Sequence, residues 1–220
     1  MRVVICDPGV GNVRSVLRAI ERASESAGAG ARSITVTREP SVVRGADYVV
    51  VPGQGAFGAF VEGIASGLGD ALREHIARDR PYLGICLGMQ VLFDSSDEAP
   101  GAPGLGVLRG HVRRLAPGVD PATSRPYPLP HIGWSGVEPG GLASVAGEAA
   151  NRTPYFYFAH TFACDPADPS VVSATTVYGE DRFASIVARG HVLGVQFHPE
   201  KSQREGLALL ARFFTPEGGL

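Results

Sequence analysis

A cysteine between two glycines, where an apolar run meets a helix-forming run, is the feature that most constrains the fold. Residues 82–85 predict a short buried strand, and residues 87–93 predict the start of a helix. Cys86 then lies on a sharp strand-to-helix turn of the nucleophile-elbow type, which leaves no room for a Cβ two residues before or after the nucleophile. Gly84 and Gly88 meet this requirement. Free N–H groups and the dipole at the helix N-terminus favour a thiolate there.

A histidine and a carboxylate that suit such a nucleophile occur far downstream, at His198 and Glu200. Side chains at i and i+2 share one face of an extended segment, and Pro199 favours extended backbone at the residue before it. Glu200 is therefore placed to fix the tautomer of the imidazole and to leave its other nitrogen free for the Cys86 thiol. The sequence predicts a Cys-His-Glu triad.

Other interpretations of these residues are available. Cys6 and Cys164 are expected to be small hydrophobic residues of the core, and His198 taken alone is equally compatible with a structural role. Cysteine and histidine also bind zinc, but the sequence contains neither a Cys-x-x-Cys nor a His-Glu-x-x-His spacing. We therefore expect no metal site.

Composition limits the class of protein. A chain of 220 residues with 44% hydrophobic and 19% charged residues can bury one sizeable core, and we expect a single domain over residues 1–220. The net charge of −2 gives no electrostatic reason to expect nucleic acid. No apolar run is long enough to cross a membrane, and the first residues lead directly into a strand pattern. Three cysteines, one of them in a reactive setting, fit a reducing cytoplasm.

Strand and helix patterns alternate in the first half of the chain, which predicts parallel βα units with helices on both faces of a sheet. The predicted strands are residues 2–6, 33–37, 48–51 and 82–85, and the predicted helices are residues 11–26, a stretch ending at 64, residues 71–78 and the helix after Cys86.

The second half of the chain has a different pattern, with short β segments typical of hairpins and meanders. These are residues 107–115, 132–137, 155–160, 171–178, 183–188 and 191–196, followed by a closing helix over 203–214. Residues 117–130 and 139–153 are expected to be loops. The predicted fold class is α/β, with a mostly parallel central sheet, flanking helices and a smaller antiparallel β portion in the second half.

Two backbone groups are candidates for an oxyanion hole, which would stabilise the negative charge on an attacked carbonyl. One is the N–H of Leu87, directly after the nucleophile. The other is the Gly53-Gln54 peptide, in a Pro-Gly-x-Gly segment at the C-terminal edge of the sheet, where open parallel sheets place their sites. Taken alone, this segment would be only a turn.

Five segments together resemble a known family. They are residues 7–15 (Asp-Pro-Gly-Val-Gly-Asn-Val-Arg-Ser), 51–57 (Val-Pro-Gly-Gln-Gly-Ala-Phe), 84–90 (Gly-Ile-Cys-Leu-Gly-Met-Gln), 131–134 (His-Ile-Gly-Trp) and 197–202 (Phe-His-Pro-Glu-Lys-Ser). The chain resembles the class I glutamine amidotransferases over nearly its whole length. Within that class it is most similar to the glutaminase subunits of imidazole glycerol phosphate synthase, an enzyme of histidine biosynthesis.

The resemblance implies hydrolysis of L-glutamine to glutamate and ammonia through a thioester on Cys86, without a cofactor. It also implies a heterodimer in which ammonia passes to a (β/α)8-barrel cyclase subunit. The roles implied for single residues are a nucleophile, base and orienting carboxylate at Cys86, His198 and Glu200, an oxyanion hole at Gly53, Gln54 and Leu87, glutamine contacts at Gly55, Gln90, Glu98, Thr161 and Phe162, and a partner interface at Asn12, Trp134 and Lys201.

The chain departs from the family pattern at two positions near the implied interface. Pro8 stands where the family commonly has tyrosine, and Ser135 stands where it commonly has asparagine. Both substitutions bear on docking and neither touches the triad. The alternatives that remain are a glutaminase serving another synthase, a free-standing γ-glutamyl hydrolase that needs no partner, and a non-catalytic binding subunit. Flexible backbone at residues 53–55 also suggests that activity is low until the partner binds.

Overall fold

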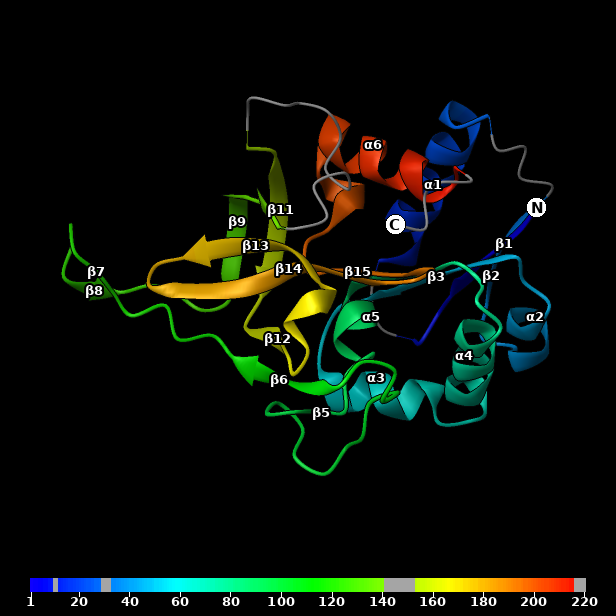
Figure 1. Ribbon diagram of the computed structural model, residues 1–220, viewed down its shortest axis with the longest axis horizontal. Coiled ribbons are helices and arrows are strands. Elements are labelled where there is room, and N and C mark those ends of the chain that lie inside the picture. The colour runs from blue at the N-terminus through cyan, green and yellow to red at the C-terminus, as the bar shows by residue number, and fades with distance from the viewer. Residues whose placement is uncertain (10–11, 29–32, 141–152, 216–220) are drawn as a thin grey trace.

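The computed structural model describes residues 1–9, 12–28, 33–140 and 153–215. Its centre is an eight-stranded sheet with the strand order β10-β13-β14-β15-β4-β3-β1-β2 (Figure 1). The strands are β1 (Arg2–Cys6), β2 (Ser33–Thr37), β3 (Tyr48–Gly53), β4 (Tyr82–Cys86), β10 (Glu138–Pro139), β13 (Val172–Tyr178), β14 (Asp181–Arg189) and β15 (Val192–Val195).

The sheet has a parallel half and an antiparallel half that meet at β15. The pairs β1–β2, β1–β3, β3–β4 and β4–β15 are parallel. The pairs β14–β15, β13–β14 and β10–β13 are antiparallel. β4 therefore lies between β3 and β15, so the ends of three parallel strands lie next to one another.

Helices cover both faces of the sheet (Figure 1). α1 (Val13–Ser26) and α6 (Gln203–Phe213) lie on one face, and α2 (Pro40–Arg44), α3 (Phe57–Ile64), α4 (Leu68–Ala77) and α5 (Leu87–Gln90) lie on the other. Alternate residues of β1 supply the two cores, with Val3 and Ile5 on the first face and Val4 and Cys6 on the second. Strands covered on both sides are apolar throughout, which explains the continuous apolar runs in the sequence.

The remaining strands form small separate sheets. β9 (His131–Gly136) pairs with β11 (Tyr155–His160), β6 (Gly110–Arg114) pairs with β5 (Ser95–Ser96) and β12 (Phe162–Pro166), and β7 (Val119–Asp120) pairs with β8 (Arg125–Pro126). Two short 3₁₀ helices, η1 (Pro169–Val171) and η2 (Pro199–Lys201), complete the described elements.

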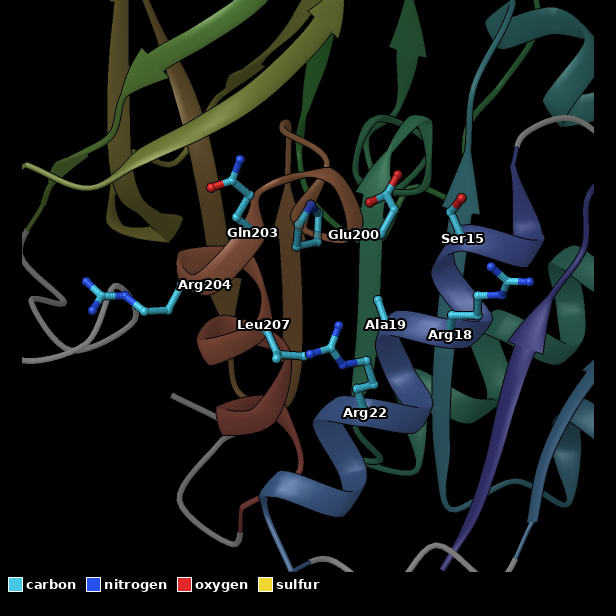
Figure 2. A pocket seen from close by; sticks show the side chains of 9 residues that line it. Ser15, Arg18, Ala19, Arg22, Glu200, Gln203, Arg204 and Leu207 are labelled. Atoms are coloured by element: carbon cyan, nitrogen blue, oxygen red, sulfur yellow. The ribbon is translucent and has the colours of Figure 1, made fainter.

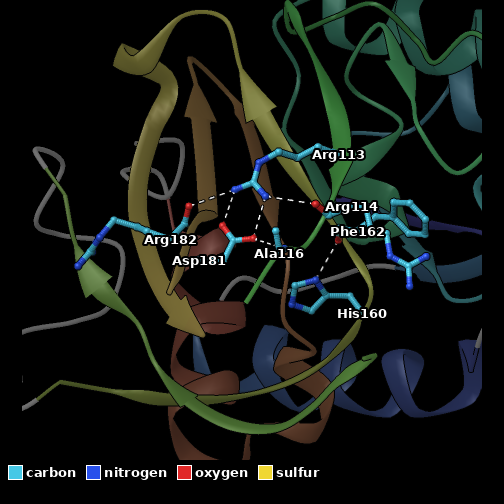
Figure 3. A network of polar contacts seen from close by, with 7 residues as sticks. All are labelled: Arg113, Arg114, Ala116, His160, Phe162, Asp181 and Arg182. Carbon is cyan, nitrogen blue, oxygen red and sulfur yellow. Dashed lines mark hydrogen bonds and ion pairs between the residues drawn. The ribbon is translucent and has the colours of Figure 1, made fainter. Parts of the chain in front are cut away.

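An ion pair joins β6 to β14 of the large sheet (Figure 3). Arg113 donates two hydrogen bonds to Asp181, at 2.9 and 2.7 Å, and the Ala116 N–H donates a third at 2.7 Å. Burial would raise the pKa of Asp181, but these donors and the Arg113 charge lower it below its usual value. The pair anchors the small β6 sheet beside the central one.

The predicted fold class is confirmed, and so are the predicted strands of the first half. The helix predicted over residues 87–93 is wrong in length, because α5 ends at Gln90. Beyond it the backbone tightens to i, i+3 bonds, and the carbonyls of Val91 and Phe93 accept from Leu105 and Gly106.

Other details also differ from the prediction. The loop predicted over residues 117–130 contains the β7–β8 hairpin, and α2 and β12 were not predicted. Part of the loop predicted over residues 139–153 and the predicted helix start at Gly11 lie outside the described residues.

Candidate active site

The turn at Cys86 has the backbone conformation that the sequence predicts. Cys86 has φ +54° and ψ −107°, a region that side-chain-bearing residues rarely adopt. A Cβ on Gly84 would overlap the Gly88 carbonyl, and a Cβ on Gly88 would overlap the carbonyl of Val51. The Tyr82 hydroxyl donates to that Gly88 carbonyl at 2.8 Å, which holds the first turn of α5 against β4. Both glycines are therefore required by close backbone contacts.

The strand register brings the histidine to the cysteine. β15 runs parallel to β4, with Val195 beside Ile85, so the chain leaving β15 enters the region into which Cys86 projects. His198 Nδ1 lies 2.8 Å from Glu200 Oε1, and only 3% of each of these side chains is exposed. The i, i+2 spacing thus gives the expected imidazole–carboxylate pair, although Glu200 is in the 3₁₀ helix η2 rather than in a strand.

The electrostatics of His198 reflect both neighbours. Burial would lower the pKa of His198, but interactions with Cys86 and with Glu200 outweigh it and raise the pKa to about 10. His198 Nε2 is buried and makes no hydrogen bond of ordinary geometry. The thiol is therefore close to the ring but not aligned as a formed hydrogen bond, as is common in catalytic pairs without substrate. Nε2 is the nitrogen left to face the sulfur.

A small pocket of about 130 Å³ opens beside Cys86. Its walls come from the ends of β3 and β4, from α5, from Glu98 and from the chain between β11 and β12. The lining residues are Gln54, Gly55, Cys86, Leu87, Gln90, Glu98, Pro130, Ala159, His160, Thr161 and Phe162. Every residue predicted to contact glutamine lines this pocket.

Hydrogen bonds fix two of these groups in the pocket wall. Gln90 Nε2 donates to the Phe162 carbonyl at 2.9 Å and to Gln196 Oε1 at 3.2 Å, so both amide hydrogens of Gln90 are used. Glu98 Oε2 accepts from the Phe57 N–H at 2.8 Å, at the start of α3. Gln90 can thus offer a ligand only its oxygen, while Glu98 brings a carboxylate held at one oxygen.

A chain of hydrogen bonds ends at the same carbonyl, and Figure 3 shows its last link, from His160 to Phe162. His160 Nδ1 lies 2.9 Å from the Phe162 oxygen, His131 Nδ1 lies 3.2 Å from His160 Nε2, and the Ser135 hydroxyl lies 2.9 Å from His131 Nε2. Burial lowers the pKa of His131 to about 4 and that of His160 to about 3, so both rings are neutral. Because a carbonyl only accepts, each ring carries its proton on Nδ1 and the Ser135 hydroxyl donates.

Sequence reasoning missed Gln196 and His160. Gln196 Nε2 lies 3.6 Å from Cys86 Sγ, and Gln196 is fully buried. The i, i+2 argument that linked His198 to Glu200 extends backward to residue 196 and would have identified it. His160 gives no comparable indication in the sequence, because its neighbours come from other strands.

The residues predicted to form the oxyanion hole are neighbours of Cys86. Gly53 is the register partner of Cys86 in the β3–β4 pair, and Leu87 is the first residue of α5, where N–H groups have no partner inside the helix. A Cβ on Gly53 would come within 2.6 Å of the Leu87 Cβ and 2.7 Å of the Phe60 ring. Only glycine allows β3 to approach the elbow so closely.

The residues predicted to face a partner lie outside the pocket. Asn12 caps α1 through the Ser15 N–H, at 3.3 Å, which is a local structural role. Trp134 is 46% exposed and meets the Tyr157 ring edge-on, and Lys201 Nζ lies 5.5 Å from the centre of that ring. Ser135 turns its hydroxyl inward to His131.

A larger groove, of about 580 Å³, lies between α1 and the η2–α6 segment (Figure 2). Arg18, Arg22 and Arg204 line it, and Glu200 reaches it from the site side. Cys86 is absent from its lining residues, so the groove does not open onto the nucleophile.

The described part of the chain contains neither a metal-ligand cluster nor a membrane-spanning helix. Among those residues, no cluster of His, Cys, Asp and Glu side chains is arranged to hold a metal ion. Within the same ranges, no helix combines the length and apolar character needed to cross a bilayer.

Known proteins resemble this chain over most of its length. The family model for "Glutamine amidotransferase class-I" matches residues 9–216. "Imidazole glycerol phosphate synthase subunit HisH" of Symbiobacterium thermophilum is 44% identical over 214 residues, which cover 96% of this chain and 92% of that protein. The plant protein "Imidazole glycerol phosphate synthase hisHF, chloroplastic" of Arabidopsis thaliana is 38% identical over 98% of this chain but only 34% of its own length.

A solved structure is similar over the whole chain. It is described as "Crystal structure of glutamine amidotransferase" and has a TM-score of 0.71 with 22% identity, covering 99% of each chain. This likeness concerns the fold.

Proposed function

This chain belongs to the class I glutamine amidotransferase family, and from this premise we propose that it is the glutaminase subunit of an imidazole glycerol phosphate synthase in histidine biosynthesis. Its reaction is the hydrolysis of L-glutamine to glutamate and ammonia. The observation that carries the proposal is the meeting of the Cys86 elbow with the His198–Glu200 pair beside the pocket. The subfamily assignment rests on relatives of this subunit that match nearly the whole chain.

The mechanism follows from the positions of the triad. The Cys86 sulfur attacks the side-chain amide carbon of glutamine while His198 holds the thiol proton. His198 then gives this proton to the amide nitrogen, and the carbon–nitrogen bond breaks. Ammonia departs, and a γ-glutamyl thioester remains on Cys86. Water, deprotonated by the same imidazole, attacks the thioester and releases glutamate. Glu200 keeps Nδ1 of His198 protonated and turns Nε2 toward the sulfur.

The oxyanion of both tetrahedral intermediates would lie between the N–H of Leu87 and the Gly53-Gln54 peptide. Losing one donor of this kind typically costs about 3 kcal/mol of transition-state stabilisation. Gly55 has φ +116°, so the loop next to this peptide has a conformation that glycine permits. Rotation of the Gly53-Gln54 peptide would turn its N–H toward the oxyanion or away from it, and would thereby form or break the oxyanion hole.

The pocket offers groups that suit the rest of glutamine. Glu98 would bind the α-ammonium group, and the Gln90 oxygen would accept from the substrate's amide or ammonium rather than meet its carboxylate, because both Gln90 hydrogens are already used. Backbone groups of Thr161 and Phe162 complete the wall. These roles need no cofactor.

We place the partner on the surface that carries Asn12, Trp134 and Lys201. Tyr155 and Ile132, which are 56% and 62% exposed, add apolar area to this surface. The partner is proposed to be a cyclase subunit with a (β/α)8 barrel, and the longer plant relative is consistent with a second component joined to a glutaminase unit. The remaining parts of the proposal are a single domain over residues 1–220, a cytoplasmic location and no nucleic-acid ligand.

Glutamine turnover by the purified chain, alone and with a barrel cyclase carrying its nucleotide substrate, tests the proposal. We expect low turnover alone and strong stimulation by the loaded partner. Equal rates with and without the partner would favour a free-standing γ-glutamyl hydrolase. Failure of a glutamine-mimicking electrophile to label Cys86 would exclude an enzyme of this kind.

A further inference from the structure

The carboxamide of Gln196 lies beside the Cys86 sulfur but does not line the pocket. It is fully buried. Its Nε2 lies 3.6 Å from Cys86 Sγ, a length suited to a hydrogen bond to sulfur, whose radius exceeds that of oxygen. Gln196 therefore contacts the proposed nucleophile without a contact to substrate.

The orientation of this carboxamide is determined by its neighbours. The Phe162 carbonyl can only accept, so Gln90 must present its NH₂ group to it at 2.9 Å. The second hydrogen of that NH₂ group then points to Gln196 Oε1, at 3.2 Å. Rotating the Gln196 carboxamide by half a turn would place its NH₂ group against the NH₂ group of Gln90. Gln196 thus directs an N–H, not an oxygen, at the sulfur.

The Phe162 carbonyl that anchors this arrangement is held from its other side by His160 Nδ1, at 2.9 Å. His131 and Ser135 extend the chain outward to β9. A network in which every proton has one allowed position is rigid, since no member can rotate without leaving a buried polar group unpaired. The donor to Cys86 is therefore held in place before any ligand binds.

We propose that Gln196 is a further functional residue of the glutaminase, whose side-chain N–H donates to the Cys86 thiolate and stabilises it. This role rests on the proposed function, because it requires Cys86 to act as a thiolate nucleophile. A neutral donor suits the position: it stabilises the anion without a second positive charge that would compete with the imidazolium of His198. Gln90 becomes a positioning residue as well as a pocket residue, since it orients Gln196.

The test measures the rate of Cys86 alkylation by iodoacetamide against pH, with the labelled peptide identified by mass. Other titratable groups around the sulfur are His198, Cys164 on β12, and Glu98 and His160 at the pocket. All of them are unchanged in the variants, so differences between variants report on residue 196.

Gln196→Met, which keeps the size and removes the donor, is expected to raise the alkylation midpoint by about one pH unit, roughly a tenfold slower reaction below the midpoint. Gln196→Glu is expected to raise it further, because it places a carboxylate oxygen against the thiolate. In both variants, kcat for glutamine falls by a similar factor at neutral pH and recovers partly at higher pH, while KM changes little. Ser173→Ala, which alters another buried polar side chain with no hydrogen-bond partner among the described residues, serves as the control and leaves the midpoint unchanged.

An unshifted midpoint in both folded variants overturns the inference while leaving the glutaminase intact. Absence of Cys86 labelling in the wild-type chain by a glutamine-mimicking electrophile instead overturns the proposed function. If neither variant folds, the wild-type chain decides by nuclear magnetic resonance. The side-chain amide signal of Gln196 must then shift with the same midpoint as Cys86 alkylation, and a signal independent of pH contradicts the contact.

Discussion

Gly53 is the direct register partner of Cys86, so the end of β3 lies beside the nucleophile at the elbow. The contact depends on glycine, because a Cβ at residue 53 would come within 2.6 Å of the Leu87 side chain. The segments that carry both proposed oxyanion donors therefore lie beside Cys86 because two parallel strands approach closely there. The same edge of the sheet receives His198 from β15, on the other side of β4.

Replacing the sulfur should separate the two half-reactions. Cys86→Ala removes the nucleophile, so glutamine hydrolysis falls by about 10⁴-fold or more. Synthesis from added ammonium salts in the presence of the cyclase partner continues, because the fold and the docking surface are unchanged. Cys6→Ala, which removes a buried thiol from β1, serves as the control and retains hydrolysis. Loss of both activities in Cys86→Ala would mean that the elbow is needed for assembly.

Glu200→Gln should leave the geometry and remove the charge that holds the imidazole. An amide can present its N–H to Nδ1 and favour the wrong tautomer, so kcat is expected to drop by roughly 10²–10⁴-fold. The pKa of His198 should also fall, since Glu200 is one of the groups that raise it. Nuclear magnetic resonance titration of the imidazole checks this, and an unchanged His198 titration would contradict the pairing.

The two glycines of the elbow should tolerate no side chain. Gly88→Ala would push a methyl group into the Val51 carbonyl and separate α5 from β3, so we expect a loss of at least about 3 kcal/mol in the free energy of unfolding. Gly58→Ala is the matched control, because its Cβ would meet only the Ala99 Cβ at 3.4 Å and it lies inside α3. Helix propensity makes this control neutral or more stable by up to about 1 kcal/mol. Urea denaturation measures both, and equal stabilities would contradict the close packing at the elbow.

Stability should fall in mild acid because of the buried histidines. The folded-state pKa values of His131 and His160, about 4 and about 3, lie below the ordinary value of 6.5. The unfolded chain therefore binds protons first as the pH falls below 6.5, and each ring costs about 1.4 kcal/mol of stability per pH unit until its folded pKa is reached. The stabilisation is complete above pH 6.5.

Urea denaturation between pH 5 and 6.5 measures this slope, in a range where most carboxylates stay ionised. His131→Gln should reduce the slope of unfolding free energy against pH by the contribution of one imidazole ring. An unchanged slope in that variant would show that His131 is accessible to protons in the folded protein. His198 does not affect this comparison, because it is unchanged in His131→Gln and contributes equally to both slopes. Its own stabilising contribution is lost as the pH rises from 6.5 toward about 10.

The sequence by itself determined the local chemistry. The glycines around Cys86 predicted the elbow, the His-Pro-Glu spacing predicted the imidazole–carboxylate pair, and the alternating strand and helix patterns predicted the α/β class. Each depends on residues close together in the chain, where backbone sterics and side-chain periodicity leave few choices. The length of α5 was mispredicted because a distant segment, residues 105–106, donates to the carbonyls of Val91 and Phe93, just beyond the helix end.

The tertiary structure alone decided which strands flank β4, and therefore that His198 and Gly53 lie on opposite sides of Cys86. It also decided that Gln196, 110 positions from Cys86 in the chain, donates to the sulfur, and that Phe162 anchors the two networks. Strand order and buried hydrogen bonds join residues far apart in sequence. Their free energy depends on packing and desolvation in the folded state, and no local pattern of residues encodes it.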